Sequence, residues 1–303
     1  MASNTAETAR VFFPAFPMFR VYKDGRIERL RPTETVPPSN DPQTGVQSKD
    51  TSSESCLPAR LFLPKITDPT AKIPLVIYIH GGAFCIESPF SPTYHNYLTS
   101  LANRANVMVV SVQYRKAPEH LLPVAYDDAW ATVKWVASHV NRDGPEPWLN
   151  DHADFERVFL AGDSAGANIA HNMMMKTGID GLIGVKIVGL LLMNPFFMNN
   201  EPDELIEFIF PSSSLCDDPR MNPASAIKDL AGLACSRVLV CASEKDFLRD
   251  RAISYYEAVR KSGWEGVIDI FETPGEGHVF HLSNPSCQKA VDLMNQVSSF
   301  LNR

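Results

Sequence analysis

The sequence predicts an α/β fold in which a mostly parallel sheet is covered by helices on both faces. From Ala59 onward, apolar runs of strand length alternate with segments of helix length. The chain has 303 residues, which suits one large α/β domain or two small ones. Apolar residues make up 45% of it, enough to bury a large core. We therefore interpret residues 1–303 as a single domain built around one sheet.

Each element of the alternation is assigned from its own pattern. The predicted strands are the short apolar runs Ala59–Leu63, Leu75–His80, Val107–Val112, Val158–Ala161, Ile187–Met193, Val238–Cys241 and Val267–Phe271. The predicted helices between most of them are Tyr94–Asn103, Tyr126–His139, Ala165–Thr177, Arg249–Ser262 and Ser286–Leu301. Around the second helix, Ala129, Val133, Val136 and Val140 recur at helical spacing, which predicts a polar face on the opposite side.

Two segments do not follow the alternation. Residues 1–50 hold proline and polar clusters around a hairpin signal, in which Phe19–Tyr22 and Arg26–Leu30 flank Lys23-Asp24-Gly25. They contain too few apolar residues for a core, so we expect an arm that packs on the domain. Residues 195–234 are rich in proline and acidic residues, which predicts an excursion from the sheet. We expect the arm and this excursion to form a small lid.

Composition and charge exclude several classes of function. The 28 Lys and Arg against 35 Asp and Glu give a net charge of −7, so no basic surface for nucleic acid is expected. No apolar run approaches the roughly 18 residues of a membrane span, and the first ten residues lack a signal-peptide pattern. Six cysteines without C-x-x-C spacing indicate free thiols. We expect a cytoplasmic protein with a small-molecule partner and with no metal or cofactor.

The pentapeptide Gly162-Asp163-Ser164-Ala165-Gly166 is the strongest chemical signal. It follows a predicted strand and opens a predicted helix, the context that a nucleophile elbow requires. A serine at such a sharp turn projects its hydroxyl away from the sheet, and the flanking glycines allow a close approach. A serine that merely caps the helix is the alternative. We expect Ser164 to be a nucleophile.

A second signal, His80-Gly81-Gly82-Ala83-Phe84, directly follows the apolar run that ends at Ile79. Two consecutive glycines can turn their N–H groups toward one point, where a carbonyl oxygen becomes negative during acyl transfer. An ordinary glycine turn is the alternative. One strand–helix–strand–helix unit separates this loop from Ser164, the spacing at which the loop after the third strand supplies an oxyanion hole. We expect Gly81 and Gly82 to donate there.

A serine nucleophile needs a base, and the base needs an acid to orient it. Among the eight histidines, only His278 lies in a glycine-flanked loop after the last predicted strand. His281 is the alternative base, and we expect it to be structural. Asp246 follows the sixth predicted strand and is the leading acid, whereas Asp250 is expected to form a salt bridge on a helix. The order Ser, Asp, His is that of α/β hydrolases rather than of chymotrypsin or subtilisin.

Five ordered segments carry a resemblance over nearly the whole chain. They are His80–Phe84, Tyr114–His120, Gly162–Gly166, Glu244–Asp246 and Gly277–Phe280. Together they resemble plant carboxylesterases of the hormone-sensitive-lipase branch of the α/β hydrolases, a group similar to hydroxyisoflavanone dehydratases and gibberellin receptors. The resemblance implies an α/β-hydrolase fold and assigns the site residues: Ser164 as nucleophile, His278 as base, Asp246 as orienter, and Gly81, Gly82 and Ala165 as oxyanion donors.

The resemblance has two departures and leaves three functions to weigh. Ala83 stands where the family has a third glycine, and the excursion after Pro195 looks shorter than in most relatives.

The resemblance also implies that Arg115 and Glu119 make buried polar contacts, and we expect side chains such as Phe84, Phe197 and Phe280 to wall the pocket. The leading function is a serine carboxylesterase acting on a small, fairly apolar ester.

The alternatives are a dehydratase or cyclase of plant specialised metabolism on the same scaffold, and a receptor-like binding protein. The intact Ser164 and Gly81-Gly82 favour the esterase over the dehydratase or cyclase. Receptors of this kind lack the triad histidine, whereas His278 is present here. The sequence leaves the physiological ester and the oligomeric state open.

Overall fold

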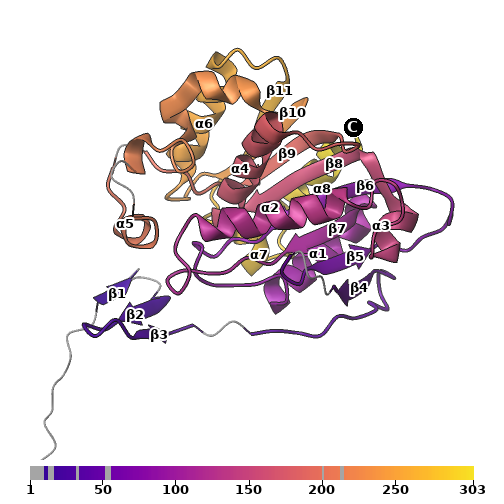
Figure 1. The fold of residues 1–303 in the computed structure, drawn as a ribbon, viewed down its shortest axis with the longest axis horizontal. Coiled ribbons are helices and arrows are strands. Elements are labelled where there is room, and N and C mark those ends of the chain that lie inside the picture. The colour runs from indigo at the N-terminus through magenta and orange to yellow at the C-terminus, as the bar shows by residue number, and fades with distance from the viewer. Residues whose placement is uncertain (1–9, 13–16, 32–33, 52–55, 200, 212–214) are drawn as a thin grey trace, which may run out of the picture.

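The computed structural model describes residues 10–12, 17–31, 34–51, 56–199, 201–211 and 215–303 (Figure 1). Within them, eight strands form one open sheet in the order β11-β10-β9-β8-β6-β7-β5-β4. The strands are β4 (Gln47–Asp50), β5 (Arg60–Leu63), β6 (Ile73–Ile79), β7 (Met108–Val112), β8 (Ala153–Asp163), β9 (Ile187–Met193), β10 (Arg237–Ser243) and β11 (Val267–Thr273). The six neighbouring strands β11, β10, β9, β8, β6 and β7 pair in parallel. At the other end of the sheet, β5 pairs antiparallel with both β7 and β4. The predicted α/β class is confirmed.

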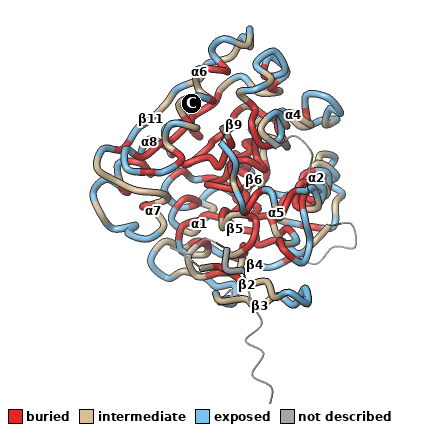
Figure 2. The backbone as a smooth tube through the Cα atoms, turned by 90° about the vertical axis from the view of Figure 1, so that its left-hand side faces the viewer, coloured by how far each residue is buried: buried red, intermediate tan, exposed pale blue. Residues whose placement is uncertain are grey.

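Helices cover both faces of this sheet. They are α1 (Pro92–Ala105), α2 (Val124–Ala137), α3 (Pro147–His152), α4 (Ala165–Asp180), α5 (Glu204–Ile209), α6 (Arg249–Lys261), α7 (Phe280–Ser283) and α8 (Gln288–Asn302), with the 3₁₀ segments η1 (Leu215–Asp217) and η2 (Pro223–Gly232). On β6, Leu75, Ile77 and Ile79 join the core under α2, α4 and α6, whereas Val76 and Tyr78 join the core under α1 and α8. Successive strand residues point to opposite faces, so a fully apolar strand fills two cores. Figure 2 shows this burial as red backbone through the sheet.

Helix α2 differs from its prediction. It ends at Ala137, and both Trp130 and Trp135 are buried along with the predicted apolar stripe, while only Asp127 and Lys134 are exposed within its span. The helix packs against α4, and its buried side chains also join the core formed with the sheet, so the expected polar face is reduced to a narrow strip. Periodicity alone could not show this second neighbour.

The arm is divided between two sheets. The predicted hairpin is confirmed, because β2 (Phe19–Val21) pairs antiparallel with β3 (Ile27–Arg29), and β1 (Arg10–Phe12) adds to it. Strand β4 instead joins the edge of the main sheet through β5. The arm also touches the excursion, because the rings of Phe19 and Phe208 lie 6.4 Å apart.

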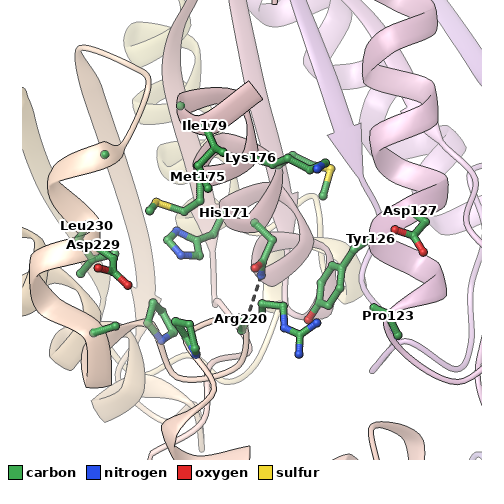
Figure 3. A pocket seen from close by; sticks show the side chains of 17 residues that line it. Pro123, Tyr126, Asp127, His171, Met175, Lys176, Ile179, Arg220, Asp229 and Leu230 are labelled. Atoms are coloured by element: carbon green, nitrogen blue, oxygen red, sulfur yellow. Dashed lines mark hydrogen bonds between the residues drawn. The ribbon is translucent and has the colours of Figure 1, made fainter. Parts of the chain in front are cut away.

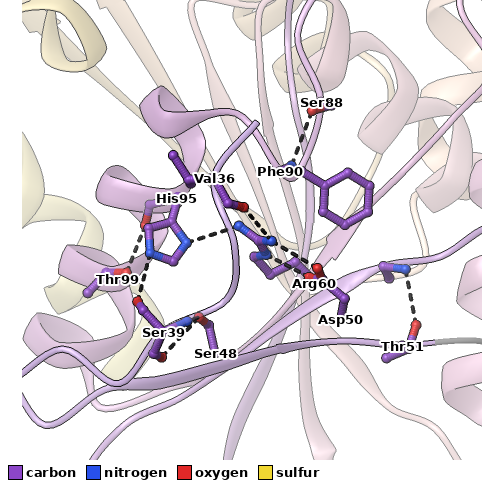
Figure 4. Close-up of polar contacts among 11 residues, drawn as sticks. Val36, Ser39, Ser48, Asp50, Thr51, Arg60, Ser88, Phe90, His95 and Thr99 are labelled. Atoms are coloured by element: carbon purple, nitrogen blue, oxygen red, sulfur yellow. Dashed lines mark hydrogen bonds and ion pairs between the residues drawn. The ribbon is translucent and has the colours of Figure 1, made fainter. Parts of the chain in front are cut away.

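Two arginines attach the arm to the domain. The buried Arg60 donates two hydrogen bonds to Asp50, at 2.7 and 2.9 Å, and one to the Val36 carbonyl oxygen, and its Nη1 lies 3.2 Å from His95 Nδ1 (Figure 4). Arg29 of β3 donates to the Ala117 carbonyl oxygen. The Arg60 contacts join Val36 and Asp50 of the arm to β5 and the start of α1, and the Arg29 contact joins β3 to the segment after β7.

The polar contacts expected for Arg115 and Glu119 are present, but they are not buried. Arg115 pairs with Asp128 at 2.7 Å, and Glu119 pairs with Arg29 of the arm. The Arg115 and Glu119 side chains are 46% and 45% exposed, which corrects the expectation of burial. Their segment lies at the surface because it connects β7 to α2 beneath the arm.

The described cysteines are free, as the sequence predicted. In the described part of the chain, no helix is long and apolar enough to cross a membrane.

Buried histidines make stability depend on pH. Burial lowers the pKa of His80, His171 and His281 to about 3, so the folded protein holds all three neutral. The unfolded chain takes up these protons below a pKa of about 6.5, so their stabilisation is complete above that pH and is lost as the pH falls through it, by about 1.4 kcal/mol each at pH 5.5. Burial raises the pKa of Asp163 to about 6, which acts oppositely and offsets a little under 1 kcal/mol.

We therefore expect the free energy of unfolding in urea to fall by about 3 kcal/mol between pH 7.5 and 5.5. Substituting one of the three, His171→Asn, should reduce this fall by about 1.4 kcal/mol, a little under half of it. An unchanged free energy of unfolding across that range would contradict neutral burial.

Candidate active site

Ser164 stands at the sharp turn between β8 and α4. Its φ of 51° and ψ of −121° are a conformation that L residues rarely adopt. The flanking glycines have a direct steric reason. A Cβ on Gly162 would lie 2.5 Å from the main chain of Gly166, and a Cβ on Gly166 would lie 2.0 Å from the Ile79 oxygen. The turn is this tight only because neither residue has a side chain.

The structure brings Ser164, His278 and Asp246 into one hydrogen-bonded chain. His278 Nε2 lies 2.9 Å from Ser164 Oγ, and His278 Nδ1 lies 2.9 and 3.0 Å from the two Asp246 oxygens. A carboxylate beside Nδ1 holds the proton on that nitrogen, which leaves the Nε2 lone pair facing the serine hydroxyl. The arrangement can therefore remove the Oγ proton.

Asp246, the acid in this series of hydrogen bonds, is itself held in place. Asp246 is buried and accepts hydrogen bonds from Asn194 Nδ2 at 2.7 Å and from the Leu248 N–H at 2.9 Å. These two donors fix the orientation of the carboxylate beside His278. Asn194 follows β9, and sequence reasoning missed it. Its only local signal is its place at a strand end immediately before a proline.

All these groups lie at one edge of the sheet. Ser164 follows β8, Asp246 follows β10, His278 follows β11, and the loop that begins at His80 follows β6. Parallel strands bring their carboxyl ends to a common edge, which is where open α/β sheets place their sites.

The two alternative residues lie outside the chain of hydrogen bonds. His281 is buried, its ring packs against Tyr97 and Phe280, and neither ring nitrogen has a hydrogen-bond partner among the described residues. Asp250 is exposed and pairs with Arg249 at 3.0 Å, as predicted.

The glycine loop differs from its prediction at Gly81. The Gly81 N–H donates to the Tyr94 hydroxyl at 2.7 Å, so it is not available to an oxyanion in this arrangement. Gly81 lacks a side chain for another reason, since a Cβ there would lie 2.4 Å from Asp163 Oδ2. Gly82 and Ala83 line the same cavity as Ser164.

Gly82, Ala83 and Ala165 keep free amide groups. None of their three N–H groups has an acceptor within the described part of the chain. Ala165 also begins α4, where helix N–H groups and the helix dipole favour negative charge. The structure thus offers Gly82 and Ala165 as donors and adds Ala83 in place of Gly81.

Asp163, inside the motif but missed as a functional residue, links the elbow to this loop. Its carboxylate is buried and accepts hydrogen bonds from the hydroxyls of Tyr78 and Tyr94, both at 2.8 Å. Burial raises the pKa of Asp163 to about 6, against the opposing effect of these two donors. Tyr94 therefore accepts from Gly81 and donates to Asp163, so one hydroxyl holds the oxyanion loop against the turn that carries Ser164.

The cavity above Ser164 has a volume of about 500 Å³. Its apolar walls are Met18, Ile86, Phe196, Phe247, Val279 and Leu282, and its polar wall includes Glu87, Thr93 and Ser283. Phe84, Phe197 and Phe280 were expected there, but they are buried and do not line it. The arm contributes Met18 and the excursion contributes Phe196.

A larger cavity of about 620 Å³ lies between α2, α4 and η2 (Figure 3). Tyr126, His171, Met175 and Leu230 are among its lining residues, and His171 Nδ1 lies 3.1 Å from the Tyr255 hydroxyl. None of Ser164, Asp246 and His278 lines it. Because Ser164 and His278 line the smaller cavity, we assign the active site to it.

Comparisons with known proteins agree with this architecture. A family model described as an alpha/beta hydrolase fold matches residues 76–282. Probable carboxylesterase 5 of Arabidopsis thaliana is 45% identical over 94% of this chain and 96% of that protein. The 2-hydroxyisoflavanone dehydratase of Glycyrrhiza echinata is 42% identical over 99% of this chain and 100% of that protein. The crystal structure of the carboxylesterase EstE1, cloned from a metagenomic library, has a TM-score of 0.70 at 27% identity, covering 84% of this chain and 88% of that one.

Tyr94→Phe tests the link between the loop and the turn. Tyr94 acts as a positioning residue, so its loss should slow acylation of Ser164 by p-nitrophenyl acetate about 10- to 100-fold, less than the loss of an oxyanion donor itself, with little change in substrate affinity. Tyr97→Phe, on the same helix, is the matched control, since the Tyr97 hydroxyl contacts only Met193 Sδ, at 3.4 Å, among the described residues. Stopped-flow measurement of the p-nitrophenol burst gives both constants. Equal effects of the two variants would show that Tyr94 only stabilises the fold.

Proposed function

The chain belongs to the alpha/beta hydrolase family, and we propose that it is a serine carboxylesterase that hydrolyses small, fairly apolar esters through an acyl-enzyme on Ser164. One observation carries the proposal: the hydrogen bonds from Ser164 through His278 to Asp246 are complete at the floor of an apolar cavity. The plant relatives named as probable carboxylesterases and the solved esterase structures support the same reaction.

The first half of the reaction forms the acyl-enzyme. Ser164 Oγ attacks the ester carbonyl carbon as His278 Nε2 takes its proton, and the carbonyl oxygen becomes an oxyanion. The N–H groups of Gly82, Ala83 and Ala165 stabilise that charge without having to rearrange. The imidazolium of His278 then gives its proton to the leaving alcohol oxygen, and the carbonyl reforms as an acyl ester of the serine.

The second half regenerates the serine. His278 takes a proton from a water molecule, whose oxygen attacks the acyl carbon, and the same donors stabilise the second oxyanion. When the carbonyl re-forms, the bond from the acyl carbon to Ser164 Oγ breaks, the His278 imidazolium returns its proton to Oγ, and the carboxylic acid leaves. Asn194 and the Leu248 N–H hold the Asp246 carboxylate beside the imidazolium, which it stabilises in both halves.

The dehydratase alternative has comparable relatives, since the 2-hydroxyisoflavanone dehydratases of Glycyrrhiza echinata and Glycine max are 42% and 43% identical to this chain. Sequence identity therefore does not distinguish ester hydrolysis from dehydration. Hydrolysis is favoured because both the nucleophile with its base and the free N–H groups beside it are present, and acyl transfer requires all of them.

We also propose a cytoplasmic location and a small-molecule ester as the partner. Free cysteines fit a reducing compartment. One relative, of Arabidopsis thaliana, is named as mitochondrial.

Removing the nucleophile gives the first test. Ser164→Ala should lower kcat for p-nitrophenyl esters on the order of 10⁶-fold, while circular dichroism and unfolding stay close to wild type. A p-nitrophenyl series from acetate to decanoate defines the acyl length that the cavity accepts. An organophosphate should label Ser164 with one equivalent, found by peptide mass spectrometry. Label on another residue, or an active alanine variant, would overturn the assignment.

The two histidines are compared by the same substitution. His278→Asn should abolish both turnover and organophosphate labelling, because within the described part of the chain only His278 hydrogen-bonds to Ser164 Oγ and can accept its proton. His281→Asn removes only a packed ring, and its kcat should stay within about tenfold of wild type. Retained activity in the first variant and its loss in the second would move the base to His281.

A further inference from the structure

The cavity above Ser164 holds one carboxylate that the mechanism does not use. Two of its lining residues carry carboxylates, Asp163 and Glu87, and Asp163 is engaged by two tyrosine hydroxyls. Among the described residues, hydrogen bonding to Glu87 reaches its main-chain oxygen, and its carboxylate has no hydrogen bond or ion pair. Its other surroundings in the cavity are largely apolar, so this acceptor is left for a ligand.

The main chain at Glu87 is fixed in an unusual conformation. Its φ of 67° lies in the left-handed region, which residues with a Cβ rarely adopt. The preceding turn is closed by hydrogen bonds from the N–H groups of Cys85 and Ile86 to the Gly82 carbonyl oxygen, both at 2.9 Å. Lys116 Nζ donates to the Glu87 carbonyl oxygen at 2.6 Å. The direction of the side chain is therefore set by the same turn that carries Gly82.

The ammonium group of Lys116, behind the loop that carries Glu87, does not pair with the Glu87 carboxylate. Glu87 raises the pKa of the Lys116 ammonium, a minor effect against the burial that lowers it, so the two charges attract. Lys116 Nζ nevertheless donates to the Glu87 main-chain oxygen, and among the described residues no hydrogen bond or ion pair joins it to the Glu87 carboxylate. Arg29, on the same side of the loop, is paired with Glu119.

We propose that Glu87 determines specificity in the acyl-transfer cavity by accepting a hydrogen bond from a hydroxyl group on a non-reacting part of the ester, and by repelling esters that carry a second, ionised carboxylate. This inference rests on the proposed esterase function. A charged acceptor in an apolar cavity gains most from a donor that reaches it, and a substrate without the donor leaves the carboxylate desolvated and unpaired. A substrate carboxylate adds like-charge repulsion at low dielectric. The favoured substrates are thus neutral hydroxylated esters, phenolic ones included.

The test uses matched esters on both sides of the scissile bond. The acyl-side set is methyl 3-phenylpropanoate with hydrogen, hydroxyl or carboxylate at the para position, and the alcohol-side set is 2-phenylethyl acetate with the same three substituents. In wild type, kcat/KM measured by pH-stat should rank hydroxyl above hydrogen above carboxylate in at least one set. In Glu87→Gln, the hydroxyl-to-carboxylate ratio should fall about 10- to 100-fold. Glu265→Gln, at an exposed position far along the chain, removes the same charge and should keep the wild-type ratio.

A binding measurement separates this proposal from the esterase itself. The same six compounds are titrated by calorimetry into Ser164→Ala with and without Glu87→Gln, so that no turnover is needed. Loss of the hydroxyl preference only when Glu87 is replaced supports the proposal, whether or not the wild type hydrolyses the esters. Equal hydroxyl-to-carboxylate ratios with and without Glu87→Gln overturn it. Absent hydrolysis of p-nitrophenyl acetate by wild type would count against the esterase and not against Glu87.

Discussion

Contact between the first turn of α4 and the end of β6 sets the geometry on which the site depends. A side chain on Gly166 would overlap the Ile79 oxygen, so its absence lets α4 start directly against the sheet edge. That close start forces Ser164 into its rare φ/ψ conformation and aims its hydroxyl away from β8. The strained backbone of Ser164 keeps this conformation because the helix, the strand and the loop around it are packed against one another. The nucleophile thus comes from a backbone constraint, and the hydrogen bonds to His278 are built upon it.

Two carboxylates near this turn have different partners and therefore different roles. Asp246 accepts hydrogen bonds from an amide side chain and a main-chain N–H, and it lies beside His278 Nδ1. Asp163 is fully enclosed and accepts hydrogen bonds from two tyrosine hydroxyls, and burial raises its pKa to about 6. The first can therefore stabilise an imidazolium, whereas the second serves as an anchor for Tyr94 and hence for the oxyanion loop.

The cavity is assembled from segments far apart in the chain. Met18 comes from the arm, Glu87 from the loop after β6, Phe196 from the excursion, Phe247 from the loop after β10, and Leu282 from the short helix α7. The arm keeps its place through Arg60 and Arg29, neither of which touches the cavity. Substrate selection therefore depends partly on polar contacts remote from the reacting atoms. Variation in the arm can change the cavity while leaving the serine, histidine and aspartate undisturbed.

The sequence by itself determined the α/β class, the strands from β5 to β11 and the helices α1, α2, α4, α6 and α8. The short helices α3, α5 and α7 were not predicted. The sequence also determined the grouping of Ser164, Asp246 and His278, because each follows a local pattern at the end of a strand. Parallel strands bring those ends together whatever the loop details are. Only the tertiary structure decided that Gly81 donates to Tyr94, that Asn194 holds Asp246, and that Phe84 lies behind the cavity wall. It also exposed Arg115 and buried both sides of α2. Each of these outcomes depends on which distant residue becomes a neighbour, and periodicity, capping and turn residues describe only interactions within a few positions along the chain.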